Sequence, residues 1–357
     1  MRVDAFDYDL PEGLIALRPL KNREEARLLC VQGPRLANRH IGDLPQLLEA
    51  GDLVVVNNTK VIPAYLKVMR APRPIGGNTE PVTIDLTLLR RCEATLWDAL
   101  ARPAKRLQTG DRLSASPEVD LVVEEKLDEG KVQLRFDCAP EDVGTLLSQK
   151  GKMPLPPYIA SRRPIDVDDI QDYQTVFAKM EGAVAAPTAG LHVTAALLAQ
   201  LKSRGVGIAE VTLHVGPATF LPVKVDDTDA HVMHAEWGEV SVGVATQINK
   251  THQKGGRVMA VGTTTLRLLE TAARDDGSVE PFCGKTSIFI VPGYRFKTAD
   301  LLLTNFHLPR STLFMMVSAF SGLESIKLAY RHAIAEKYRF YSYGDACLLE
   351  RSNHSTP

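Results

Sequence analysis

Three histidines, His192, His214 and His307, fall near the end of a predicted strand or the start of a predicted helix. An imidazole titrates near neutral pH, so it can accept or donate a proton during a reaction. Glu236, in the stretch HVMHAEW, adds a carboxylate of the kind that also serves acid–base catalysis. We therefore take these four residues as candidate catalytic groups for proton transfer.

The same stretch allows a second interpretation, a metal-dependent hydrolase that uses His231, His234 and Glu236. The spacing is not HExxH, and a three-residue gap places two histidines on one face only in a helix. The residues that follow, WGEVSV, are typical of a strand. The five cysteines are scattered and never form CxxC, which argues against a zinc or iron–sulfur site. We expect no metal, and keep the hydrolase as the alternative.

A possible binding site for an anion begins at Gly262. Thr263, Thr264 and Thr265 follow it at a predicted helix start, where backbone N–H groups and hydroxyls can face a ligand. Arg267, one turn further, could hold a carboxylate or a phosphate through two hydrogen bonds. The stretch lacks both the lysine of a P-loop and the spacing of GxGxxG, so ATP or NAD binding is not indicated. Ordinary threonine capping and an exposed arginine are the alternative.

Composition and charge restrict the class of protein. The 357 residues are 45% hydrophobic and 24% charged, which is typical of a globular chain. No apolar run is long enough to span a bilayer, and the first residues are acidic, unlike a signal peptide. We therefore expect a cytoplasmic protein without a membrane partner.

The net charge is −1, yet residues 60–112 hold ten Lys and Arg against five Asp and Glu. This local excess suits a polyanion that touches one region. Its most compact cluster is Arg102, Lys105 and Arg106 in RPAKR. Chance clustering on a solvated surface is the alternative.

Two regions with different patterns of apolar residues predict the fold. Residues 61–152 contain short strand candidates, TIDLTLL, DLVVEEKL and KVQLRFDC, separated by Gly, Pro and charge clusters, which favours a small antiparallel barrel. Residues 153–357 alternate β runs with helical patterns, as a parallel or mixed α/β sheet does. We expect an α/β fold whose catalytic domain is discontinuous, made of residues 1–60 and 153–357, with the barrel-like domain 61–152 inserted.

The repeated unit in the α/β region is a strand, a polar turn and a capped helix. Thr194 precedes one helical pattern, RVMAV runs into Gly262, and ADLLLTNFHLPRST places Asn305 and His307 before a cap at Ser311 or Thr312. In open α/β sheets such turns lie at the carboxyl edge of the strands, where ligands bind. The sequence therefore predicts that His214 and His307 reach the same edge.

Several stretches resemble one family along nearly the whole chain. They include GAVAAPTAGLHVT, LHVGPATFLPVK, HVMHAEW, VGTTTLRLLE, TNFHLPRSTLFMMVSAFSG and EKYRFYSYGDACLL, with FDYDLPEGLIA and NNTKVIPA near the start. The chain is thereby similar to the S-adenosylmethionine:tRNA ribosyltransferase-isomerases of queuosine biosynthesis. It departs from their pattern at five positions, which are Ala26, Tyr65, Val193, Pro217 and Ala218.

The resemblance implies a reaction. The amine of 7-aminomethyl-7-deazaguanine at the wobble position of tRNA would attack a ribosyl unit from S-adenosylmethionine, which leaves epoxyqueuosine in the tRNA and releases adenine and methionine. S-adenosylmethionine is then a consumed cosubstrate, no other cofactor is needed, and we expect a monomer. A non-catalytic RNA-binding module, with the basic segment as its surface, is a third possibility.

The reaction assigns further candidates. The carboxylate of the methionine part needs a cation or a helix N-terminus, which the residues from Thr263 to Arg267 could supply. An aromatic face can attract the sulfonium. The candidate cosubstrate-binding residues are Thr263, Thr264, Thr265, Arg267, Phe220, Trp237, Tyr294 and Asn305.

Overall fold

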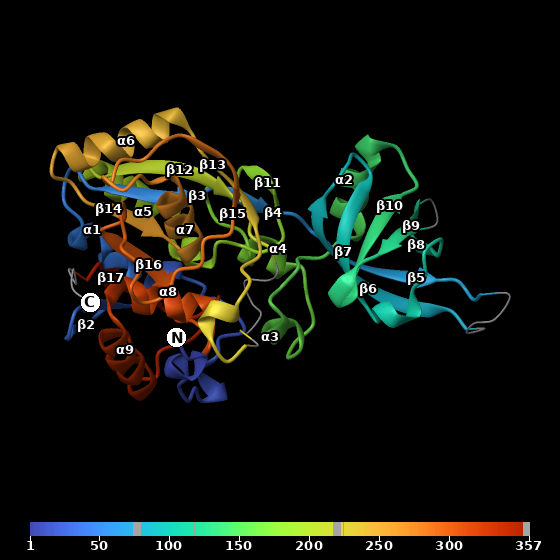
Figure 1. The fold of residues 1–357 in the computed structure, drawn as a ribbon, viewed down its shortest axis with the longest axis horizontal. Coiled ribbons are helices and arrows are strands. Elements are labelled where there is room, and N and C mark those ends of the chain that lie inside the picture. Colours follow the sequence, from blue (N-terminus) through green and yellow to red (C-terminus); the bar gives the residue numbers. More distant parts are fainter. Residues whose placement is uncertain (74–79, 117–118, 217–222, 224, 353–357) are drawn as a thin grey trace. The chain divides into compact units, whose positions relative to one another are not determined.

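The protein is described here as a computed structural model that covers residues 1–73, 80–116, 119–216, 223 and 225–352. The chain forms two compact units, traced in Figure 1. The α/β unit comprises Met1–Thr59, Gln174–Met180 and Ala186–Pro357, and the barrel unit comprises Lys60–Tyr173 and Glu181–Ala185. The predicted class, a discontinuous α/β domain with an inserted antiparallel barrel, is confirmed.

The α/β unit is built on a nine-stranded mixed sheet with the order β15-β13-β12-β3-β14-β16-β17-β1-β2. Its strands are β1 (Arg27–Gln32), β2 (Arg35–His40), β3 (Leu53–Asn57), β12 (Gly207–Leu213), β13 (Glu236–Val240), β14 (Val258–Val261), β15 (Phe282–Thr286), β16 (Leu301–Asn305) and β17 (Ala346–Glu350). Within it, β12, β3, β14 and β16 run parallel to one another. Their carboxyl ends therefore share one edge of the sheet, called the carboxyl edge below.

Helices accompany the sheet, and polar caps start several of them. They are α1 (Leu44–Leu47), α5 (Ala195–Ser203), α6 (Val242–Gln253), α7 (Thr263–Ala272), α8 (Thr312–Ser321) and α9 (Leu323–Ala335). The Thr194 hydroxyl accepts the N–H of Leu197 at 3.0 Å, and Ser311 caps α8 in the same way. These caps satisfy backbone donors that the first helical turn leaves unpaired, so the helix starts predicted from local sequence are confirmed.

The sheet is apolar on both faces. Val54 and Val56 of β3 pack with Leu197 of α5 in one core cluster, together with Met259 and Val261 of β14. Alternate strand residues point to the other face, and the intervening Val55 and Ala260 are also fully buried. A parallel strand covered on both faces is a continuous apolar run, which is why GDLVVVNNT and RVMAV show no alternation.

The barrel unit is a closed antiparallel barrel with the strand order β10-β7-β6-β5-β8-β9. Its strands are β5 (Tyr65–Arg70), β6 (Val82–Arg91), β7 (Leu96–Arg102), β8 (Arg112–Ser116), β9 (Val119–Lys126) and β10 (Lys131–Phe136). Inward positions on these strands, such as Leu86, Ala99 and Leu134, are fully buried. The unit also holds α2 (Pro140–Lys150), α3 (Pro157–Ala160) and α4 (Asp168–Asp172).

The boundaries of the units differ from the ranges expected from sequence. Residues 153–173 and 181–185, which we expected in the α/β domain, make their contacts within the barrel unit. In the second segment, Val184 packs in the barrel's own core. Directly before the first segment, Tyr65 and Lys152 exchange two hydrogen bonds, which hold the chain to the barrel at that point. The chain passes from one unit to the other in β4 (Thr59–Val61) and again in β11 (Met180–Ala183). These two strands pair with each other as a two-stranded sheet.

No single helix in the described part of the chain is long and apolar enough to cross a membrane. Among the described helices, only α8 and α9 taken together reach that length and composition, and they are bent by 114° at their junction.

Candidate functional site

Polar residues follow each of the four parallel strands at the carboxyl edge. Thr59 comes just after β3, His214 after β12, Thr263 after β14 and the turn at Gly262, and His307 after β16. The predicted placement of His214 and His307 at one edge is therefore confirmed. Two strands, β3 and β14, separate β12 from β16, so the two histidines lie roughly 14 Å apart along the edge. They share an edge without acting on one atom directly.

His214 is held by two neighbours. Its Nδ1 lies 2.8 Å from the Thr59 hydroxyl, and its ring stacks on Trp237 with centroids 5.2 Å apart at an interplanar angle of 21°. Burial lowers the pKa of His214, so the imidazole is neutral at pH 7. A neutral ring with one nitrogen oriented by a hydroxyl can offer the other as a proton acceptor. Trp237 thus gives one face of its ring to this imidazole.

His192 ends a 3₁₀ helix, η7 (Thr188–His192), and is buried. The Thr188 hydroxyl donates to Asn305 Oδ1 at 2.8 Å, and Asn305 Nδ2 lies 3.1 Å from His192 Nε2. An amide NH₂ only donates, so Nε2 accepts and Nδ1 carries the proton. Burial, aided by Arg23 and Arg339, lowers the pKa of His192 to about 3. His192 is thus a neutral hydrogen-bond donor, and Asn305 orients it.

His307 is tied into the packing behind β16. Its Nε2 lies 2.9 Å from the Thr304 hydroxyl, and its backbone N–H donates to the Tyr330 hydroxyl at 2.9 Å. The Tyr8 hydroxyl donates to its carbonyl. Burial lowers the pKa of His307 to about 3. These contacts and the low pKa suit a structural role better than proton transfer, because a general base works best with a pKa near the operating pH.

Glu236 and Arg267, which we expected to act separately, form a buried ion pair. Arg267 Nη1 lies 2.5 Å from Glu236 Oε2, and the two side chains are 2% and 8% exposed. Glu236 Oε1 also accepts the N–H of Gly216 at 2.9 Å. Arg267 Nη2 has no hydrogen-bond partner among the described residues. The charge that we assigned to a ligand carboxylate is therefore already matched by Glu236.

The start of α7 keeps polar groups available. Gly262 has φ +90°, in the region that favours glycine, and turns β14 into the helix. The Thr265 hydroxyl donates to the carbonyl of Val261 at 2.8 Å. The Thr264 hydroxyl is buried and has no partner within the described part of the chain, and Thr263 is also buried. Backbone N–H groups and the Thr264 hydroxyl are what this turn can offer.

The two remaining aromatic candidates are Tyr294 and Phe220. The Tyr294 hydroxyl donates to Glu270 Oε2 at 3.2 Å, and Glu270 also accepts the backbone N–H groups of Lys297 and Thr298. Tyr294 thus closes a loop after β15. Phe220 lies outside the described residues, as do Pro217 and Ala218.

The described residues lend the metal alternative no support. Glu236 is engaged by Arg267, and His231 packs edge-on against Phe289 at 5.0 Å. Within the described ranges no group of three or more His, Cys, Asp or Glu side chains could hold a metal ion.

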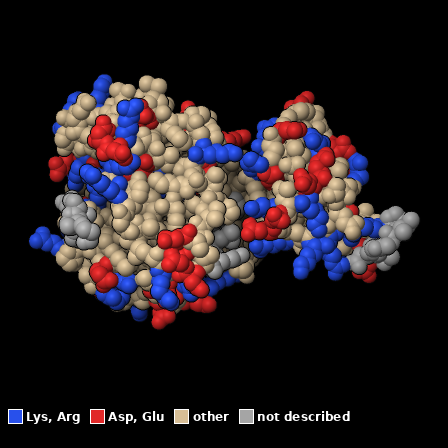
Figure 2. Space-filling model, in the orientation of Figure 1, with Lys and Arg blue, Asp and Glu red and all other residues tan. Residues whose placement is uncertain are grey.

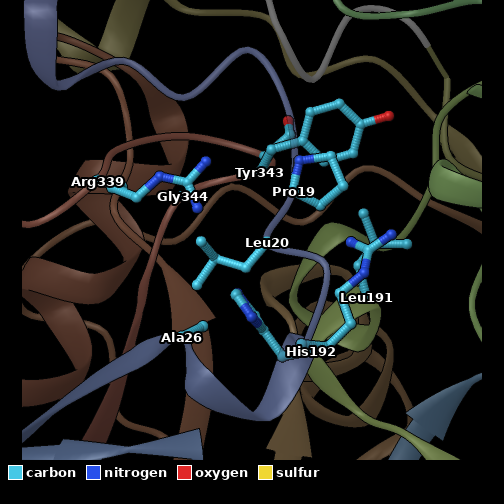
Figure 3. A pocket seen from close by; sticks show the side chains of 10 residues that line it. Pro19, Leu20, Ala26, Leu191, His192, Arg339, Tyr343 and Gly344 are labelled. Carbon is cyan, nitrogen blue, oxygen red and sulfur yellow. The ribbon is translucent and has the colours of Figure 1, made fainter.

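Sequence reasoning missed a small pocket beside His192. Leu20, Ala26, Arg339 and Tyr343 line it with His192, and Figure 3 shows them around one hollow. Arg23 lines it as well. Ala26 is one of the departures from the family pattern. The stretch EKYRFYSYGDACLL, which contains Arg339 and Tyr343, carried the resemblance, but no strand–turn–helix pattern marked it as part of a site.

The basic cluster lies on the barrel unit. Arg102 ends β7, and Lys105 and Arg106 lie in a short 3₁₀ helix; all three are exposed. Most neighbouring cations are paired, as Arg90 is with Asp98 at 2.6 Å. Arg102, Lys105 and Arg106 make no ion pair within the part of the chain that the structure describes. Figure 2 shows a group of Lys and Arg on one face of this unit.

Comparisons with known proteins agree with this architecture. The family model described as a queuosine biosynthesis protein matches residues 3–349. An S-adenosylmethionine:tRNA ribosyltransferase-isomerase from Bradyrhizobium diazoefficiens is 56% identical over 99% of this chain and 97% of its own length. One from a Methylobacterium species is 54% identical over 99% of both chains.

A solved structure is also similar. It is an S-adenosylmethionine tRNA ribosyltransferase from Thermotoga maritima, 34% identical, with a TM-score of 0.54 over 96% of this chain and 99% of that chain. The chain belongs to the queuosine biosynthesis family, as the resemblance predicted.

Proposed function

We propose that this chain is an S-adenosylmethionine:tRNA ribosyltransferase-isomerase. The observation that carries the proposal is identity of 53% to 56% to enzymes of that name along nearly the whole chain. The reaction joins the ribosyl part of S-adenosylmethionine to 7-aminomethyl-7-deazaguanine in tRNA and releases adenine and methionine. The same proposal includes a monomer that works in the cytoplasm and uses no metal or other cofactor.

The carboxyl edge supplies groups for this chemistry. A proton next to the sulfonium must be removed, and the free nitrogen of His214 is the best placed acceptor among the candidates, since His192 and His307 are held neutral by deep burial. The face of Trp237 away from His214 can attract the sulfonium. The start of α7, with the Thr264 hydroxyl, suits the neutral ribose, because Arg267 is already paired.

The barrel cluster supplies a surface for tRNA. Arg102, Lys105 and Arg106 are exposed and have no acidic partner among the described residues, so their charges remain available to phosphates. The exposed, unpaired state of the cluster supports this role more than chance clustering does.

The deciding experiment incubates the purified protein with S-adenosylmethionine and tRNA that carries the precursor base. Adenine, methionine and modified tRNA should appear in equal amounts, with EDTA present or absent. S-adenosylhomocysteine as the product would mean methyl transfer and would overturn the proposal. Activity that EDTA abolishes would instead favour the metal-dependent alternative.

A further inference from the structure

Side chains and backbone groups of two neighbouring strands fix the position of His214. At the end of β3, the buried Asn57 side chain accepts the backbone N–H of Leu213 at 3.0 Å and donates to the Leu213 carbonyl at 2.9 Å. The backbone N–H of His214 donates to the carbonyl of Trp237 in β13 at 2.9 Å. The backbone that carries the imidazole is therefore held by β3 and by β13.

The same asparagine also positions Thr59. Asn57 Oδ1 accepts the backbone N–H of Thr59 at 3.2 Å, and the Thr59 side chain is buried. The Thr59 hydroxyl lies 2.8 Å from His214 Nδ1 and 3.4 Å from the carbonyl oxygen of Met180, the first residue of β11. Thr59 thus lies between a carbonyl, which can only accept a hydrogen bond, and a ring nitrogen, which can accept or donate.

The single proton of this hydroxyl decides the tautomer of His214. If Thr59 donates to the Met180 carbonyl, His214 Nδ1 must carry a proton and donate to Thr59, so Nε2 has a free lone pair. If Thr59 donates to Nδ1 instead, the proton of the neutral ring is on Nε2, which then cannot accept another. Only the first arrangement makes a hydrogen bond of both contacts of the buried hydroxyl, which favours it.

We infer that Thr59 is a positioning residue of the reaction: its hydroxyl donates to the Met180 carbonyl and thereby holds His214 in the tautomer whose Nε2 accepts a proton. The inference rests on the proposed function, in which His214 removes the proton next to the sulfonium. It adds Thr59 to the site, a residue that the sequence did not single out.

This tautomer allows proton transfer without a change of partners. The electron pair of the broken C–H bond stays on the carbon, and the proton goes to Nε2 of His214. The ring then carries a proton on each nitrogen, and Nδ1 keeps its hydrogen bond to the Thr59 oxygen. Thr59 therefore stabilises the imidazolium from a position that it already holds before the reaction.

The first readout is the tautomer itself, measured by nitrogen NMR on the full chain with isotope-labelled histidine. Signals of His214 are those that His214→Asn removes. In the wild type, Nδ1 should be protonated and Nε2 unprotonated. Thr59→Val, which removes the hydroxyl at nearly constant size, should give a mixture of tautomers, and Thr59→Ser should restore the wild-type pattern. Thr246→Val, an exposed threonine of α6, is the matched control.

The second readout is the rate with S-adenosylmethionine and precursor-bearing tRNA. Thr59→Val should lower kcat about 10- to 100-fold, as expected for loss of a hydrogen bond to a charged ring, and leave KM nearly unchanged. Thr59→Ser should recover most of that loss. Thr246→Val should match the wild type in both constants.

A wild-type protein with the proton on Nε2 would overturn the inference, because Thr59 would then donate to the ring. So would a Thr59→Val variant that keeps the wild-type tautomer, or one in which valine and serine lower kcat and melting temperature alike. The expected tautomers with an unchanged kcat would remove both Thr59 and His214 from the reaction. A wild-type protein that has the expected tautomer but releases no adenine or methionine overturns the proposed function instead.

Discussion

The carboxyl edge of the large sheet and the surface of the barrel hold charge in opposite ways. At the edge, these ionisable groups are buried and carry no net charge: Glu236 neutralises Arg267, and His192 and His307 are kept uncharged. On the barrel, Arg102, Lys105 and Arg106 are exposed, without an acidic partner in the described ranges. Buried groups have fixed positions, which bond-making chemistry needs, whereas exposed cations can follow the flexible phosphate chain of an RNA. This difference suits the carboxyl edge to the reaction and the barrel surface to the binding of RNA.

The largest expected effect belongs to His214. His214→Ala should lower the single-turnover rate by about 10²–10⁴-fold, because a positioned proton acceptor is lost. Melting temperature and tRNA affinity should stay near the wild-type values. His332→Ala, on α9, is the matched control. If His214→Asn restores the rate, His214 only positions Thr59 by hydrogen bonding. The proposal that the carboxyl edge supplies the proton acceptor would then be wrong.

The buried ion pair should dominate stability. Arg267→Met leaves Glu236 charged and alone in the interior, so the free energy of unfolding should fall by about 3–5 kcal/mol. The double variant Arg267→Met with Glu236→Gln should recover a large part of it, since no unpaired charge remains. Denaturant unfolding measures both. A loss below about 1 kcal/mol would show that the pair is solvated like a surface pair.

The neutral histidines make stability depend on pH. Burial depresses the folded-state pKa of His192 and His307 to about 3, while the unfolded chain binds these protons near pH 6.5. Between these values the unfolded state holds more protons, so stability falls as pH decreases, by about 1.4 kcal/mol per pH unit for each histidine. Unfolding measured from pH 6.5 to 5 should show a slope that steepens toward this value as the pH falls, and His307→Asn should remove part of it. A slope that is the same in that variant would place His307 in solvent.

The smallest effect concerns the barrel. Neutralising Arg102, Lys105 and Arg106 together should leave S-adenosylmethionine binding and melting temperature unchanged. It should weaken tRNA binding and reduce the slope of log affinity against log salt by roughly 0.7–0.9 for each lost phosphate contact. Arg90, Arg112 and Arg135 are ion-paired on the same unit, so their triple neutralisation is the control. An identical salt slope in both triple variants would mean that the exposed cluster does not meet RNA.

Local features of this fold were predictable from sequence. The cap at Thr194, the glycine turn at Gly262 and the alternating barrel strands each depend on residues a few positions apart. Such short-range patterns leave a clear trace in a sequence.

Contacts between distant segments were not predictable. Glu236 and Arg267 were each recognised as polar residues near a strand end or helix start, but no periodicity states that they neutralise each other. The pocket unites Arg23 and Arg339 from the two ends of the chain. The barrel boundary was missed at residues 153–173 for a different reason, since α3 and α4 are too short to show a period.

The insertion of the barrel between β3 and the rest of the sheet has a consequence for biosynthesis. A ribosome delivers β1 and β3 first, yet β3 pairs with β12 and β14, and β1 pairs with β17 at the far end of the chain. The barrel strands, β5 to β10, are contiguous and can close as soon as Phe136 has emerged. At ordinary elongation rates β3 then waits on the order of ten seconds for its first partner. During that time its apolar residues, LVVV, belong to an unpaired strand, so the nascent chain remains exposed to aggregation even after its barrel is complete.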